Sequence, residues 1–181
     1  QSMDISHSAN TQPPVRLRSP ETAQHATDVR DDLFMPELYR YTFPELVATN
    51  RECGEDEESY KAMAGFSFLY GLRFDMTIYR CCGSLRDIPR YAAYLKEISA
   101  LYEQYGDFLL RGRFVDGDGF TSDSENVLVK GWEGCNGGLA VSLWNPTGED
   151  QVVNLRSRKT GRAVTIIVPA ERVAAAVIDE A

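Results

Sequence analysis

The pattern of the chain changes after Leu110, and this change restricts its fold more than any other feature. Before that point apolar residues recur at helical spacing, whereas beyond it short strand-forming runs alternate with Gly, Asp and Asn. Strands at regular spacing joined by tight turns are typical of an antiparallel β-sandwich. The pattern predicts strands at residues 111–115, 126–132, 138–144, 151–155, 163–168 and 172–178.

The most regular helix is predicted from about residue 88 to residue 105. Asp87 is a capping residue type, and Pro89 stands in the first turn, where its missing N–H needs no partner. Apolar side chains then recur at helical spacing, with Leu95 and Ile98 as expected core positions. Gly106 is predicted to end this helix.

A second helix, from about residue 57 to residue 72, is apolar almost all round. Such a helix is buried on several sides, and we expect it to need more covering protein than this chain supplies. Strands are predicted at 39–43, before Pro44, and at 73–79. The polar residues 1–32 are predicted to be a flexible tail. The expected organisation is therefore a tail (1–32), an α/β segment (33–110) and a sandwich (111–181).

Composition and charge exclude several classes of function. A formal net charge of −8 and scattered basic residues argue against nucleic-acid binding. No run of eighteen apolar residues occurs, so no membrane span is predicted. His7 and His25 are the only histidines, and both lie in the polar tail. Catalysis by Ser-His or Cys-His pairs, or by His-ligated zinc, is therefore not expected, and any chemistry would depend on carboxylates, Tyr or Lys.

Two glycine-rich motifs predict neither a metal nor a cofactor. Asp116–Gly119 misses the EF-hand spacing and is interpreted as an acidic hairpin turn. The glycines from Gly131 to Gly138 lie between strands, with no helix and no Lys-Ser/Thr after them, so a phosphate cradle is not expected.

Three segments carry a resemblance to a known family. Leu38-Tyr39-Arg40-Tyr41-Thr42-Phe43-Pro44-Glu45, Phe68–Asp75 with Ile78-Tyr79-Arg80, and the run from Val127 to Pro146 resemble the end of a bacterial family of large, mostly uncharacterised glycoside-hydrolase-like proteins. In that family a TIM barrel precedes a small C-terminal β-sandwich. The resemblance covers about residues 33–181 and implies a partial TIM-barrel end followed by the sandwich, with carbohydrate as the partner.

The chain departs from that family in length. A (β/α)8 barrel needs about 200–250 residues, and about 80 residues precede the sandwich here, enough for the last two strand–helix units. Part of a barrel leaves strand edges and a sheet face open. We therefore expect either a homo-oligomer or the missing remainder of the barrel to cover them.

If residues 33–110 form the end of a TIM barrel, as the resemblance implies, Glu45 and Asp75 are candidate catalytic carboxylates. Glu45 directly follows a predicted strand and Asp75 lies in one, and the active site of a TIM barrel lies at the carboxyl ends of its strands. Glycosidases use such a pair of carboxylates. Arg40 and Arg73 would bind substrate hydroxyls or tune the carboxylates. The alternative is that the four residues form an ion-paired network that ties the elements together.

Trp132 and Trp144 are candidates for stacking on sugar rings, since an aromatic face suits the C–H side of a pyranose. The alternative is that both rings fill the core of the sandwich or its contact with the preceding segment. Three functions remain: the C-terminal portion of a glycoside-hydrolase-like protein, a carbohydrate-binding module, and a structural module that forms oligomers.

Overall fold

The computed structural model describes residues 36–44, 46–54, 57–78 and 83–179, with residues 50–54, 57–60 and 75–78 described by their backbone alone. The helices are α2 (Pro36–Thr42), α3 (Glu57–Leu69) and α4 (Pro89–Leu109), with a short 3-10 helix η3 (Leu85–Asp87). The strands are β1 (Thr49–Gly54), β2 (Arg73–Ile78), β3 (Arg113–Asp116), β4 (Phe120–Ser122), β5 (Leu128–Glu133), β6 (Leu139–Trp144), β7 (Gln151–Ser157), β8 (Ala163–Val168) and β9 (Val173–Asp179).

The C-terminal part forms two antiparallel sheets, with strand orders β3-β5-β6-β9 and β4-β7-β8. Apolar side chains from both sheets meet in one core, which includes Val141, Leu143, Val153, Leu155 and Ile178. The predicted antiparallel sandwich is thus confirmed, and each predicted strand begins and ends close to an observed one.

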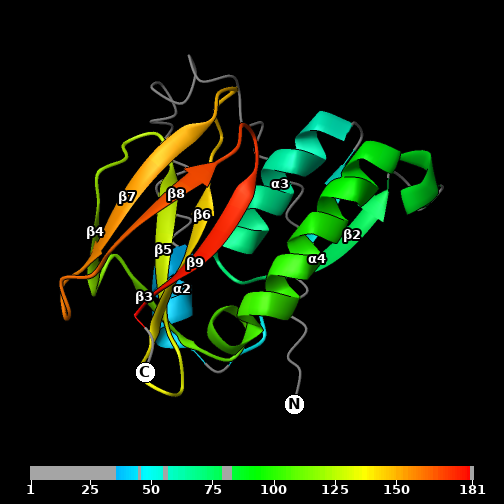
Figure 1. Ribbon diagram of the computed structural model, residues 1–181. Helices are drawn as coiled ribbons and strands as arrows, with labels where there is room; N and C mark the ends of the chain where they lie inside the picture. Colours follow the sequence, from blue (N-terminus) through cyan, green and yellow to red (C-terminus); the bar gives the residue numbers. More distant parts are fainter. Residues whose placement is uncertain (1–35, 45, 55–56, 79–82, 180–181) are drawn as a thin grey trace, which may run out of the picture.

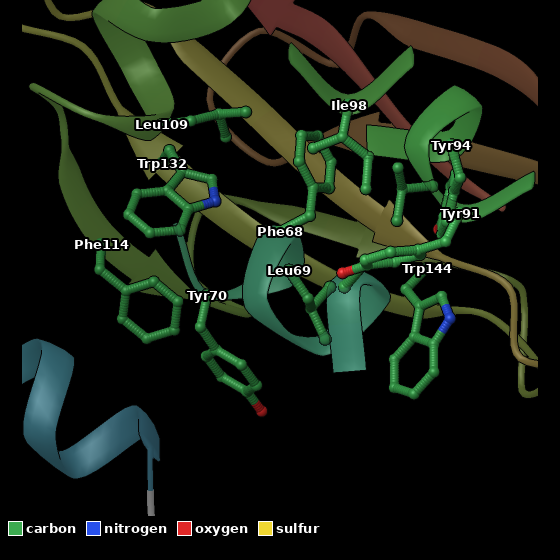
Figure 2. Close-up of a cluster of buried hydrophobic side chains, with 12 residues drawn as sticks. Phe68, Leu69, Tyr70, Tyr91, Tyr94, Ile98, Leu109, Phe114, Trp132 and Trp144 are labelled. Carbon is green, nitrogen blue, oxygen red and sulfur yellow. The ribbon is translucent and has the colours of Figure 1, made fainter. Parts of the chain in front are cut away.

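The four-stranded sheet is covered on both of its faces (Figure 1). The three-stranded sheet packs on one face, and α3 and α4 pack on the other, so the sandwich and the two helices form three layers. A second core lies between the helices and the sheet and contains large aromatic rings, including Phe68, Tyr91, Phe114, Trp132 and Trp144 (Figure 2). Because β6 lies in the middle layer, all of its residues are buried.

Before the sandwich, β1 and β2 form a parallel pair, and α3 is the crossover that joins them. Their register runs from Thr49 opposite Arg73 to Gly54 opposite Ile78. Among the described residues, no third strand pairs with either edge of this two-stranded sheet. Figure 1 shows β2 beside α4, on the side away from the sandwich.

Two expectations about the helices need correction. Residues 39–43 were expected to form a strand because aromatic and β-branched residues favour one, but 36–42 form helix α2. Pro36 begins it and Glu37 stands in its first turn, both of which favour a helix start. Gly106 does not end α4, which continues to Leu109 because that side chain is fully buried.

The expectation that α3 exceeds the cover available in this chain is wrong for its C-terminal half. Ala64, Phe68 and Leu69 are buried by the chain's own four-stranded sheet and α4. The predicted core position Ile98 is buried as well, whereas Leu95 lies at the margin of the same core. The acidic turn after β3 is also not a hairpin, because β3 and β4 belong to different sheets.

Candidate functional site

The two candidate carboxylates are placed differently by the fold. Glu45 lies outside the described residues, and the segment before it is α2 and a turn, so no strand ends there. Asp75 is the third residue of β2 and stands opposite Arg51 of β1 in the register. Its side chain is not among those described.

The two candidate arginines lie at the amino-terminal edge of the parallel pair. Arg73 is the first residue of β2, has an exposed side chain, and donates its backbone N–H to the carbonyl of Ala48 at 2.9 Å. Arg40 is 4% exposed, and its Nη1 donates to the carbonyl of Leu46, shortly before β1, at 3.2 Å. Both therefore lie away from the carboxyl ends of β1 and β2, where a barrel would have its active site.

Both tryptophans belong to the core between the helices and the sheet (Figure 2). Trp132 is 0% exposed and donates its indole N–H to the hydroxyl of Ser142 at 2.9 Å, and Trp144 is 5% exposed. Phe114 meets Trp132 edge-on at 5.1 Å between centroids. Neither indole presents a face to solvent in this arrangement, so the rings fill the core and are not placed to stack on a sugar.

A different polar cluster, which we call the Lys130 cluster, joins α2 to the sandwich. Lys130 Nζ donates to Glu37 Oε1 at 2.8 Å and to Asp116 Oδ1 at 2.6 Å. Tyr70 donates its hydroxyl to the same Glu37 oxygen at 2.5 Å, and the ammonium also lies 5.5 Å from the centroid of the Tyr70 ring. Residues from four separate elements or their ends thus converge on one ammonium group.

The electrostatics of the Lys130 cluster favour its charged form. Burial raises the pKa of the Glu37 carboxyl, but hydrogen bonds from Lys130 and Tyr70 outweigh this effect, so its net pKa is lowered. Burial lowers the pKa of Lys130, and the hydrogen bonds to Asp116 and Glu37 more than reverse it. The pKa of Tyr70 is raised by burial and by its bond to Glu37. Lys130 of β5 thus binds both Glu37 of α2 and Asp116 of β3, and this arrangement holds α2 against the sandwich.

Sequence reasoning missed the Lys130 cluster because its members are far apart in the chain. Glu37 and Lys130 are separated by 93 positions. One signal was present: a lysine two residues before Trp132 in a strand lies on the same face as that tryptophan, and hence toward the core. A lysine on such a face needs carboxylate partners.

A surface groove of about 460 Å³ adjoins the Lys130 cluster at the edge of the sandwich. The buried side chains of Phe120 and Val127 contribute to its lining, together with the polar side chains of Ser122, Lys130 and Arg158. Arg158 Nε donates to the carbonyl of Phe120 at 2.9 Å, which fixes the guanidinium beside the groove. The groove can therefore offer hydrogen bonds next to an apolar surface.

Within residues 36–179, leaving aside the undescribed positions, no group of three His, Cys, Asp or Glu side chains is arranged to hold a metal ion. No described helix is both long and apolar enough to cross a membrane. Comparison with protein-family models, with curated proteins and with solved structures finds no match to this chain.

Proposed function

We propose that this chain is the C-terminal portion of a glycoside-hydrolase-like protein that acts on carbohydrate, and that it is not catalytically complete alone. The observation that supports this most is the order of its elements. A parallel strand–helix–strand unit (β1, α3, β2) is followed by α4 and then by an antiparallel sandwich. Two strand–helix units before a sandwich are what the end of a (β/α)8 barrel followed by such a domain would contain.

The open edges of the parallel pair support the same proposal. Parallel strands occur almost exclusively in larger sheets with both faces covered, since each strand relies on neighbours for its hydrogen bonds. Here β1 and β2 pair only with each other within the described residues, and α3 packs against both strands. Further strands alongside them would satisfy both edges, as the remainder of a barrel does.

Asp75 is the better of the two proposed catalytic carboxylates. Phe74 packs toward α4, with its ring 6.2 Å from that of Tyr102, whereas Arg73 is exposed. Because a strand alternates its faces, position 75 belongs to the face of Arg73, opposite the helices. In a barrel this is the interior face, from which catalytic side chains approach the substrate.

The test uses the complete natural polypeptide and a panel of aryl α- and β-glycosides. We expect hydrolysis of at least one substrate, and we expect Asp75→Asn to lower kcat by about 10²–10⁴-fold, the usual contribution of a catalytic acid or base. Asp118→Asn, in the exposed turn after β3, is the matched control and should keep full activity. Hydrolysis unaffected by Asp75→Asn would remove that residue from the site, and no hydrolysis across the panel would reject the function.

A second candidate is a carbohydrate-binding module without catalysis, and the groove beside Lys130 favours it. Its hydroxyl, guanidinium and apolar groups are the kinds that bind a hydroxylated ligand. Calorimetric titration with neutral oligosaccharides should then show binding that Arg158→Ala weakens and Lys159→Ala, a neighbouring exposed change, does not. Absence of heat with every oligosaccharide would exclude this candidate.

A further inference from the structure

Helix α2 contains a buried cation, Arg40, that has no counter-ion among the described residues. Arg40 is 4% exposed, and its guanidinium lies 5.2 Å above the centroid of the Trp132 ring. Its Nε is buried without a hydrogen-bond partner, and among the described residues only the Leu46 carbonyl accepts from it. Burial lowers the pKa of Arg40, and no carboxylate of the described residues opposes this effect.

A buried guanidinium without a carboxylate is unfavourable. Removing a charge from water is costly unless another charge and hydrogen bonds replace the water. The ring of Trp132 offers partial compensation through its π face. The remaining donors of the planar guanidinium match the two oxygens of a carboxylate.

The same segment also exposes large apolar side chains. These are 45–58% exposed and come from α2 and the residues after it: Leu38, Tyr41, Phe43 and Val47. Apolar side chains gathered on one surface segment are typical of a protein–protein contact. Two unfavourable features thus lie within twelve residues of each other: a buried cation without a carboxylate partner among the described residues, and exposed apolar side chains.

We propose that residues 36–44 and 46–47 form a docking surface for a further strand–helix unit whose Asp or Glu side chain pairs with Arg40. This inference rests on the proposed function, because the barrel supplies the partner. Arg40 reaches Leu46, and Tyr102 donates its hydroxyl to Leu72, so both contacts lie just before the first residues of β1 and β2. The partner carboxylate is therefore expected near the amino-terminal ends of the parallel strands. The proposed catalytic site lies at their carboxyl ends.

The first test uses acetate as a minimal carboxylate and this chain alone. The chain has two tryptophans, so its two indole N–H signals can be assigned in an NMR spectrum with a Trp144→Phe variant. At matched ionic strength, replacing chloride with acetate should shift the Trp132 signal, leave the Trp144 signal in place, and raise Tm by roughly 2 °C. Equal responses of both indoles, or none, would overturn the proposal.

Variants identify the group that binds acetate. Arg40→Met should abolish the response and Arg40→Lys should weaken it, because an ammonium lacks the planar fork of donors. If Arg40→Met fails to fold, the signal shift in the unsubstituted chain still decides the outcome. A Glu45→Gln variant provides a further check: if only that variant responds to acetate, Arg40 is already paired within the chain and no outside partner is needed.

The second test distinguishes the source of the carboxylate. In the complete natural polypeptide, Arg40 should already pair with a carboxylate of that polypeptide. Acetate should therefore no longer shift the Trp132 signal. A continued shift would overturn the docking proposal.

Light scattering should also show this chain alone to be monomeric. A dimer that the Phe43→Asp variant dissociates would mean that the partner is a second copy of this chain, and would contradict the proposed strand–helix unit. The readout does not depend on glycoside hydrolysis, so failure of this inference can be distinguished from failure of the proposed activity.

Discussion

The sandwich and the parallel strand pair differ in how completely the chain surrounds them. In the sandwich, β6 has a strand on each side and a packed layer on each face. In the parallel pair, β1 and β2 each have one neighbouring strand among the described residues, and α3 packs against them. The central strand of the sandwich is thus paired along both edges, whereas each strand of the parallel pair has one unpaired edge within the described residues.

The same contrast can be seen in the residue patterns. The β6 sequence Leu-Ala-Val-Ser-Leu-Trp is almost continuously apolar, as expected for a strand covered on both faces. The β7 strand alternates buried and exposed residues because only one face meets the core. The β2 sequence Arg-Phe-Asp-Met-Thr-Ile also alternates. Its sequence is therefore typical of a strand with one polar and one apolar face.

The largest expected effects come from removing side chains that hold the layers together. Phe68→Ala should lower the free energy of unfolding by about 3–5 kcal/mol, and Leu143→Ala by about 2–5 kcal/mol, since both side chains are fully buried. Because α3 packs against both the parallel pair and the four-stranded sheet, we expect helical circular dichroism and tryptophan fluorescence to report one transition. Two well-separated transitions in these variants would show that the regions are independent and would break the comparison.

Lys130→Met should have the next largest effect, about 1–3 kcal/mol, because it leaves two partly buried carboxylates without their cation. Denaturant unfolding measures this loss. Arg113→Gln is the matched control: it removes an exposed ion pair with Glu133 and should change stability by less than about 0.5 kcal/mol. Similar losses in both variants would show that the Lys130 cluster does not fix α2 to the sandwich.

Gly65→Ala tests the contact between α3 and the sheet. A Cβ at this position would lie 2.4 Å from the indole nitrogen of Trp144, so the helix or the ring must move. Overpacking should cost about 1–3 kcal/mol and outweigh the gain of about 1 kcal/mol in helix propensity. Gly148→Ala, where a Cβ would meet nothing within 4 Å, should be close to neutral in the same thermal unfolding experiment. A stabilised Gly65→Ala variant would mean that α3 lies farther from the sheet.

The smallest expected effect is the pH dependence due to Glu37. Its carboxyl pKa is lower in the folded state than its ordinary value of 4.5, so its ionisation stabilises the fold above about pH 4.5. This contribution is lost as the pH falls through the lowered pKa. Glu37→Gln should therefore flatten the decrease in unfolding free energy between pH 5 and pH 3. An unchanged slope would show that another carboxyl, such as Asp179, whose pKa is also lowered, accounts for the decrease.

The sandwich could be predicted from sequence. Its strands either alternate polar and apolar residues or are almost continuously apolar, and its turns contain Gly, Asn and Asp. Two strands gave no such signal: β4 has three residues and follows a glycine-rich turn, and β1 reads Thr-Asn-Arg-Glu-Cys-Gly, with no apolar face. The helix α2 was mistaken for a strand because tertiary contacts outweigh its β propensity. Tyr41, for example, donates its hydroxyl to the carbonyl of Val115 and meets Phe114 edge-on.

The polar clusters were harder to predict than the fold. The Lys130 cluster joins residues that are distant in sequence, and only the position of Lys130 beside Trp132 on one strand face hinted at it. Arg40 was expected to bind substrate, yet its environment depends on α2 being a helix that places it over Trp132. Long-range packing decides such neighbours, and local residue patterns do not contain that information.

Amide hydrogen exchange tests most directly whether the two regions differ as described. In this chain alone, the amides of β6 should exchange only through global unfolding, because this strand is paired on both sides and covered on both faces. The amides of β1 and β2 should exchange through local opening, with a free energy several kcal/mol lower. Equal protection of β1, β2 and β6 would show that the parallel pair is already complete, and would contradict the proposal that it is the end of a larger sheet.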